Sequence, residues 1–331
     1  MASRLAELER RVARLIELQE LGLVEKAALA AQELWSVQRP DAIRVRDGFV
    51  ALAKPLPGVM SDRHPPARSL GPPLAKLVSS HGVTLRTALM ALFVAHCAPS
   101  SPKLMNHLPI EPDGEFVGWR DLIVVVADAR PGTVRAVSPN DNRVRQIKRA
   151  FDRLAQPEVG LIAQPRAGTA RRKYEDMRLL HERGVRPTGI APDYSLPRPT
   201  DSVVAIPSDF FRQGWVNVLD DSELAAFLMF RHRTQSAAAG EGVALTGDDR
   251  LSRYVQRRSV WDKHQMLADL GLMETVADER RRPDGTVENF AEDGPAAFHR
   301  FTMKDEPLAH PALNSGLADL TASAERLASL G

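Results

Sequence analysis

The 331-residue sequence contains one cysteine, three tyrosines and only 5% aromatic residues. A single thiol, Cys97, cannot form an intrachain disulfide, and this favours a reducing compartment. No apolar run is long enough to span a bilayer, and the first residues lack the apolar segment and cleavage site of a secretory signal. We therefore expect a cytoplasmic protein that does not enter a membrane.

Short motifs of catalysis and metal binding are also missing. The sequence has no His-Glu-x-x-His, no Gly-x-x-x-x-Gly-Lys-Ser/Thr loop, no Gly-x-Ser-x-Gly elbow and no cysteine pair at metal-ligand spacing. His81, His96 and His107 lie in one stretch, but their spacing matches no metal motif. We expect no cofactor, no metal and no enzymatic activity. An enzyme whose site is assembled only by the fold is the remaining alternative.

Positive charge is concentrated although the net charge is only +2. Residues 130–186 contain fourteen Lys and Arg residues against six Asp and Glu residues. The stretch from residue 284 to the end is acidic by contrast. A basic segment of this kind is suited to binding phosphate groups.

Residues 220–302 have the order helix, helix, helix, hairpin. Asp220, Asp221 and Ser222 are typical helix-capping residues, and the apolar residues after them recur at helical spacing as far as residue 234. The later elements are a helix at 248–255, a helix at about 256–270, a strand at 272–277, a hairpin tip at 280–285 and a return strand at 298–303.

The third helix and the hairpin tip carry the candidate contacts of this segment. Spacing turns Val260, Leu267 and Leu270 inward, and Gly271 ends the helix. The residues left on the outer face, together with the basic hairpin tip, are Arg257, Arg258, Ser259, Lys263, Arg280, Arg281 and Arg282, with His264 as a further candidate.

The order of these elements, the junction Leu270-Gly271-Leu272 and the basic hairpin resemble the winged helix-turn-helix superfamily. The resemblance implies that the third helix enters the major groove of DNA and that the hairpin, or wing, touches the backbone or the minor groove. Many proteins of this fold bind other proteins or only dimerise, so the fold alone does not establish DNA binding.

A similar pattern lies upstream and suggests an internal repeat. Residues 88–96 match 224–232, each an apolar run closed by histidine, and residues 143–154 match 259–270. In this copy the elements expected are a helix at 119–128, a third helix capped by Asn140 or Asp141, a strand at 159–163, a turn at 165–169 and a basic return strand. Its candidate DNA contacts are Arg143, Arg145, Lys148, Arg149, Arg171, Arg172 and Lys173. Chance similarity of two amphipathic helices is the alternative.

The N-terminal segment forms a separate element. Leu5, Leu8, Val12 and Leu15 keep a heptad spacing, which suits either a dimer contact or docking on the same chain. Pro-rich stretches then divide the chain. The expected parts are an N-terminal helix (1–36), a linker (37–73) with a possible strand at 43–52, a first winged-helix-like domain (74–185), a linker (186–207), a second winged-helix domain (208–303) and a C-terminal tail helix (304–331).

The sequence thus predicts a mainly α protein with small β-hairpins (α+β), built from tandem winged helix-turn-helix domains with an N-terminal helix. We expect a sequence-specific protein for double-stranded DNA, acting as a homodimer, with a transcriptional regulator as the first interpretation. Tandem winged helices also resemble plasmid replication initiators, so a replication initiator or partition protein is the alternative. A winged-helix adaptor that binds proteins is the second alternative.

Overall fold

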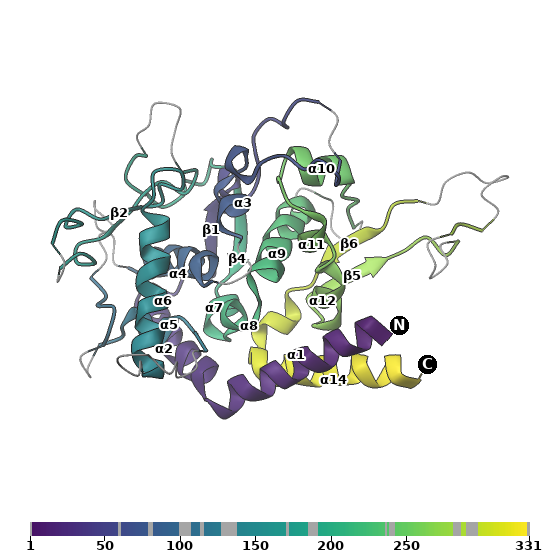
Figure 1. The fold of residues 1–331 in the computed structure, drawn as a ribbon, viewed down its shortest axis with the longest axis horizontal. Helices are drawn as coiled ribbons and strands as arrows, with labels where there is room; N and C mark the ends of the chain where they lie inside the picture. The colour runs from purple at the N-terminus through teal and green to yellow at the C-terminus, as the bar shows by residue number, and fades with distance from the viewer. Residues whose placement is uncertain are drawn as a thin grey trace, which may run out of the picture.

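The computed structural model describes residues 2–58, 61–78, 82–98, 107–112, 116–126, 138–169, 172–184, 191–235, 237, 242–280, 286–288 and 297–329 (Figure 1). Its helices are α1 (Ala2–Glu20), α2 (Leu23–Gln38), α3 (Pro73–Leu77), α4 (Thr84–Cys97), α5 (Trp119–Leu122), α6 (Pro139–Leu154), α7 (Asp209–Arg212), α8 (Trp215–Val218), α9 (Asp221–Thr234), α10 (Gly247–Ser252), α11 (Arg258–Trp261), α12 (His264–Asp269) and α14 (Ala312–Ser329). Short 3-10 helices are η1 (Asp47–Phe49), η2 (Arg68–Leu70) and η3 (Glu306–Ala309).

The strands of the described residues form two-stranded antiparallel sheets. β1 (Ala42–Arg46) pairs with β4 (Val203–Pro207), β2 (Ile162–Ala163) with β3 (Arg178–Leu179), and β5 (Met273–Val276) with β6 (Arg300–Met303). A single bridge joins Val243 to Phe301 and adds a third short segment beside β6. The fold is therefore mixed α/β, with helices prevailing and small sheets.

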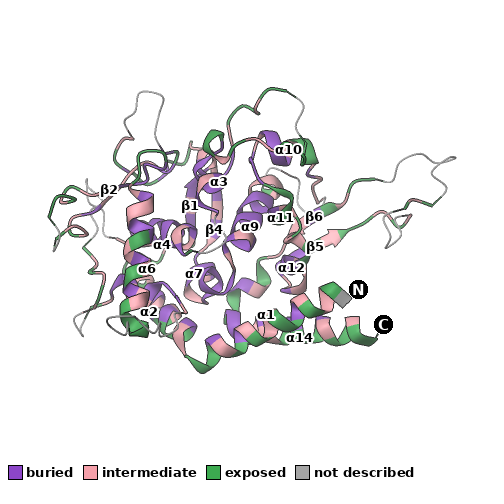
Figure 2. Ribbon diagram, in the orientation of Figure 1, coloured by how far each residue is buried: buried purple, intermediate pink, exposed green. Residues whose placement is uncertain are grey.

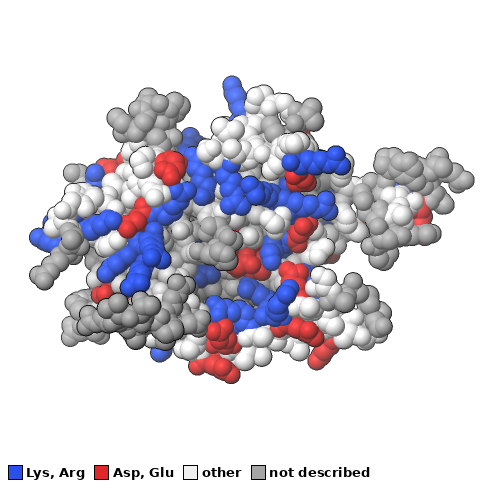
Figure 3. Space-filling model, viewed as in Figure 1, with Lys and Arg blue, Asp and Glu red and all other residues white. Residues whose placement is uncertain are grey.

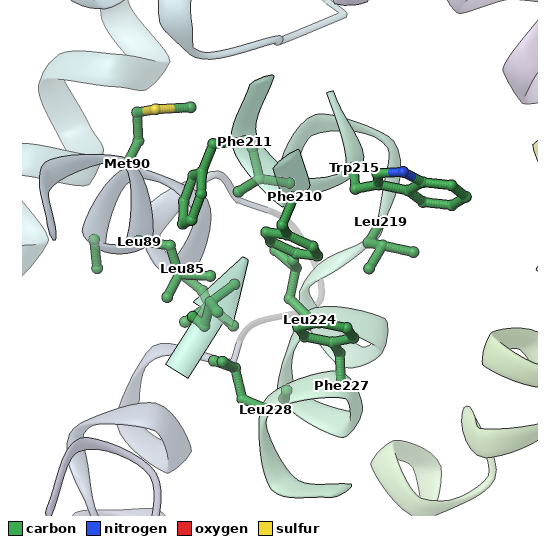
Figure 4. Packing of buried hydrophobic residues seen from close by; sticks show 14 of the residues in the cluster. Leu85, Leu89, Met90, Phe210, Phe211, Trp215, Leu219, Leu224, Phe227 and Leu228 are labelled. Atoms are coloured by element: carbon green, nitrogen blue, oxygen red, sulfur yellow. The ribbon is translucent and has the colours of Figure 1, made fainter. Parts of the chain in front are cut away.

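One hydrophobic core runs through the described parts of the chain. The four-residue helix α7 supplies Phe210 and Phe211, which lie between α4 and α9 (Figure 4). Phe211 stacks on Phe93 of α4 at 4.7 Å between ring centroids, and Phe210 stacks on Phe227 of α9 at 4.6 Å. Buried residues accordingly concentrate around β1, β4, α7 and α9 at the centre of the molecule (Figure 2). The two expected domains share this core.

Both expected linkers contain a strand of the central sheet. β1 lies within residues 37–73 and β4 within residues 186–207, and they pair with Arg44 opposite Ala205. The possible strand at 43–52 is therefore confirmed in its first part. Neither segment is only a spacer. No helix of the described residues is both long enough and apolar enough to cross a membrane.

The N-terminal helix α1 packs along the C-terminal helix α14 (Figure 1). Its predicted apolar stripe is covered there, since Leu8 and Leu15 are fully buried. Arg11 of α1 also forms an ion pair with Glu223 of α9 at 2.6 Å. The stripe is thus used inside the chain, against the C-terminal half and not the first domain, and it gives no support to a homodimer through this helix.

Capping residues and residue spacing predicted the bounds of several helices and strands. α9 begins and ends at the predicted residues, and its N-cap Asp220 exchanges hydrogen bonds with Glu223 in a capping box. β5 and β6 fall within the predicted strands. α10 is shorter than the expected helix at 248–255.

The upstream copy departs further from expectation. α6 is capped by the hydroxyl of Ser138, with Pro139 in its first turn, and not by Asn140 or Asp141. α5 ends at Leu122 although a helix was expected to residue 128. The return strand β3 lies after the basic residues expected to form it: Arg172 and Lys173 are in a turn.

Candidate nucleic-acid interface

Helix α6 is amphipathic and presents a basic face to solvent. Val144, Ile147 and Phe151 are buried, and the helix packs against α4 and α5. Trp119 of α5 meets Phe151 edge-on, with 4.9 Å between ring centroids. Because 3.6 residues make a turn, burial of this stripe leaves the cationic side chains between its members on the other side. Lys and Arg side chains gather over α6 on the surface (Figure 3).

Three cations of this face have no carboxylate partner among the described residues. Arg145 and Arg149 are exposed one turn apart. Lys148 is half-buried and lies over the ring of Tyr174, 5.9 Å from its centroid. Like charges one turn apart repel each other, and an anion bound between them would relieve that repulsion. Arg145, Lys148 and Arg149 therefore form a surface ready for anions.

The other predicted cations near α6 are already engaged. Arg172 pairs with Glu175 at 2.6 Å, and Lys173 pairs with Asp152 at 2.8 Å. Arg143 is half-buried and donates to the carbonyl of Arg120 at 3.4 Å, and burial lowers the pKa of its guanidinium. Arg171 lies outside the described residues. The structure therefore brings together only part of the basic set predicted for this copy.

A polar cleft of about 650 Å³ lies beside α6. Arg86 lines it, and its guanidinium donates to the carbonyls of Val216, Val124 and Leu219 at 3.0, 2.6 and 3.0 Å. Burial lowers the pKa of Arg86 to about 10. This arginine is committed to joining the first part of the chain to the turn before α9.

The predicted third helix of the downstream copy is broken in two. α11 ends at Trp261, Asp262 and Lys263 form a turn, and α12 begins at His264. Arg257, Arg258 and Ser259 at its start are exposed, as predicted. Arg258 lies 3.7 Å from Asp262, an exposed pair that contributes little to stability.

Lys263 was predicted to face solvent, but its side chain is half-buried. Its ammonium lies 3.3 Å from Glu7, 3.7 Å from Asp220 and 4.0 Å from Glu223. His264 also turns inward, where its ring packs edge-on against Phe301. Burial lowers the pKa of His264. The turn that breaks the helix directs both side chains toward the protein. Lys263 meets carboxylates from α1 and α9, and His264 meets an aromatic cluster.

Replacing Lys263 with alanine should therefore lower stability and not DNA affinity. Glu223 is almost fully buried and would lose one of its cations, so we expect the free energy of unfolding to fall by about 1–3 kcal/mol. Urea denaturation measures this. Lys26→Ala, at an exposed lysine of α2, is the matched control and should change little. A Lys263→Ala protein of unchanged stability that binds duplex DNA more weakly would restore the sequence-based role.

The described part of the wing includes one of its three predicted arginines. Arg280 is half-buried and pairs with Asp278 at 3.1 Å, and the hydrogen bonds from Arg280 are the largest of the effects that lower the pKa of that carboxyl group. Arg281 and Arg282 lie outside the described residues. The two strands predicted for the wing are present as the hairpin β5–β6, but Arg280, the one predicted wing arginine among the described residues, is paired with Asp278.

The described residues include no evident metal site and no reactive thiol. No group of three or more His, Cys, Asp or Glu side chains is placed there to hold a metal ion. Cys97 is buried, and burial raises the pKa of its thiol to about 12, so it is not a reactive thiolate. The ring of His96 accepts a hydrogen bond from the backbone N–H of Arg44 at 3.2 Å, which is a structural role.

Comparison with known proteins gives no match: no family model, no curated protein and no solved structure matches the chain. A function for this protein therefore has to be inferred from the geometry of its described residues.

Proposed function

We propose that this protein binds double-stranded DNA through two winged-helix units and that α6 is its main DNA-reading helix. The observation that carries the proposal is the row of cations on α6, Arg145, Lys148 and Arg149, which have no carboxylate partner among the described residues. Phosphate groups supply the missing negative charge, and a helix with an exposed basic face can enter a major groove.

The order of elements supports the winged-helix assignment. In the downstream unit, α9, the bridge at Val243, α10, α11–α12, β5 and β6 follow one another as a winged helix requires. The upstream unit runs α4, α5, α6, β2 and β3. α4 and α9 are both 14 residues long.

The central sheet supports a repeat. β1 precedes the upstream unit and β4 precedes the downstream unit, and the two strands pair antiparallel about Arg44 and Ala205. An antiparallel strand pair has a local two-fold axis, and that symmetry fits two copies of one unit. In this arrangement Lys263 of the downstream unit is held by carboxylates and supplies no free charge to DNA.

Exchanging Arg145 and Arg149 together for alanine tests the proposal. We expect weaker binding to any duplex, with the slope of log affinity against log salt falling in magnitude by about 0.9 for each phosphate that is no longer bound. If either residue also reads a base, preference for a selected site should fall by about 1–3 kcal/mol. Both side chains are exposed, so stability should stay within about 0.5 kcal/mol.

Titration of a labelled duplex at several salt concentrations gives these quantities. Arg10→Ala, at an exposed arginine on α1 with no ion-pair partner among the described residues, is the control and should behave as wild type. No binding at low salt by the intact chain, or full binding by the α6 variant, would refute the proposal. Selection of bound fragments from the source genome would then separate a regulator from a replication initiator or partition protein by where the fragments lie.

The adaptor alternative rests on a different surface. Val276 and Phe298, near the end of the β5–β6 hairpin, are exposed by 55% and 63%. Exposed apolar side chains on a hairpin favour contact with a protein. Val276→Ser with Phe298→Ser should leave DNA affinity unchanged if α6 reads DNA, and loss of a protein partner without loss of DNA binding would support the adaptor role.

A further inference from the structure

The polar cleft beside α6 borders the basic face of that helix. Asn142, Gln146 and Arg149 line the cleft, and they lie about one turn apart along one side of α6. Arg149 also belongs to the basic face, where it lies one turn from Arg145. It therefore stands where the basic face meets the cleft, so a molecule bound in the cleft can reach a cation that we assign to DNA.

The cleft also holds a guanidinium group whose charge is not paired. Each nitrogen of the Arg86 guanidinium donates one hydrogen bond to a carbonyl oxygen, and no carboxylate among the described residues pairs with it. Carbonyl groups are neutral, so they satisfy N–H donors without balancing the charge. A charge withdrawn from water is costly unless an opposite charge meets it, and an anion in the cleft supplies that charge.

Acidic residues at the start of α9 line the same cleft. Asp220 caps α9 and lies 3.7 Å from Lys263. Burial lowers the pKa of Arg86 more than the charge of Asp221 raises it, so the positive charge of that guanidinium stays undercompensated. The cleft thus presents cationic groups together with carboxylate acceptors. This lining suits an anion that also carries hydroxyl or amino groups.

The size of the cleft fits a small organic molecule. Its volume of about 650 Å³ is within the range of about 300–1,000 Å³ that is usual for small-molecule sites. A lone inorganic ion would fill only a fraction of it. Because guanidinium groups present paired N–H donors to carboxylates and to phosphates alike, both kinds of oxyanion suit Arg86 and Arg149.

We propose that this cleft binds a small organic anion, a phosphate ester or a carboxylate with hydroxyl or amino groups, and that the bound anion weakens the contact of α6 with DNA. Arg86 and Arg149 hold the oxyanion, and the side-chain amide of Gln146 donates to it. Asp221 accepts from the hydroxyl or amino group of the ligand. The effect on DNA rests on the proposed function, whereas binding in the cleft does not.

The regulatory effect follows from the arginine that the two sites share. An anion that pairs with Arg149 removes one cation from the face that meets phosphates. Affinity for every duplex should then fall, and the slope of log affinity against log salt should fall in magnitude by up to about 0.9. Coupling between two ligands is reciprocal, so bound DNA lowers the affinity for the anion by the same factor.

Thermal unfolding of the full chain tests for binding in the cleft. The probes are pyrophosphate and citrate, each compared with chloride at equal ionic strength. A ligand that binds the folded chain alone raises the unfolding midpoint as its concentration rises. We expect this rise with at least one probe, and the probe that gives the larger rise shows whether the site prefers a phosphate or a carboxylate. No rise with either probe would overturn the proposal.

Three variants locate the binding site. Gln146→Glu places a negative charge in the cleft and should abolish the rise, and Arg149→Ala should remove most of it. Arg145→Ala is the matched control, because it removes the same charge from an exposed position of the same helix outside the cleft lining, and it should keep the full rise. Equal rises in wild type and Gln146→Glu, or equal losses in Arg145→Ala and Arg149→Ala, would place the anion elsewhere and overturn the site.

Titration of a labelled duplex, in the probe and in chloride at equal ionic strength, tests the effect on DNA. Wild type should bind on the order of fivefold more weakly when the cleft is saturated. Arg145→Ala should weaken by the same factor, whereas Arg149→Ala should bind equally in both solutions. A probe that weakens both variants alike competes with DNA for the outer basic face, and this result would overturn the regulatory role.

Failure of this inference can be told from failure of the proposed function. If the chain binds duplex at low salt and neither probe raises the midpoint, the cleft site is wrong and the proposed function stands. If the chain binds no duplex, but a probe raises the midpoint of wild type and not that of Gln146→Glu, the cleft site stands. In that case the proposed function fails, and with it the effect of the anion on DNA.

Discussion

Replacing Glu182 with alanine should lower the free energy of unfolding by about 3–5 kcal/mol, because it removes the buried one of the two carboxylates that pair with Arg46 and leaves only the partly exposed Asp201. Arg46 of β1 and Glu182 have side chains only 6% and 1% exposed, and Nη1 of Arg46 lies 3.0 and 2.9 Å from the two carboxylate oxygens. Arg46 also pairs with Asp201 at 2.8 Å and donates to the carbonyl of Ser195 at 3.0 Å. Urea denaturation at neutral pH measures the loss.

Two further variants serve as controls for this prediction. Asp193→Ala removes an exposed carboxylate that pairs with Arg178 at 3.0 Å. It should change the free energy of unfolding by no more than about 1 kcal/mol. Arg46→Met combined with Glu182→Leu removes both buried charges and should recover most of the stability that Glu182→Ala removes. A loss below about 1 kcal/mol for Glu182→Ala would mean that water reaches this pair and that the central sheet is open there.

Phe211→Ala should cost about 3–5 kcal/mol and lower the stability of both halves together. Its ring stacks on Phe93 and meets Phe210 edge-on at 5.4 Å, so the cavity opens where α4 and α9 are joined through α7. We expect one cooperative transition before and after the change, with circular dichroism and tryptophan fluorescence coinciding. Phe116→Ala, at an exposed phenylalanine, is the control and should have little effect. Two separated transitions, of which the change moves only one, would restore the two-domain expectation.

Elements fixed by their own sequence were predictable. α9 carries its cap, its capping partner and its apolar residues within one segment, so its ends could be predicted directly. The buried residues of α6 follow from the match of residues 143–154 to 259–270, because Val144, Phe151 and Leu154 take the inward positions of that pattern. The exposed Arg145 and Arg149 follow from that face.

Features that depend on distant residues were not predictable. Lys263 faces inward because Glu7, far away in the sequence, reaches it from α1. The stripe of α1 is covered by α14, and nothing near Leu8 indicates that partner.

The pairing of β1 with β4 also determines the order in which the molecule can be completed during translation. β1 is made early, but its partner at residues 203–207 leaves the ribosome roughly 10–30 s later at about 5–20 residues per second. Until then Ile43 and Val45 have no strand to cover them, and α1 waits longer still for α14. Both β1 and α1 are therefore synthesised well before the segments that cover them, and α1 can dock fully only after α14 has been made.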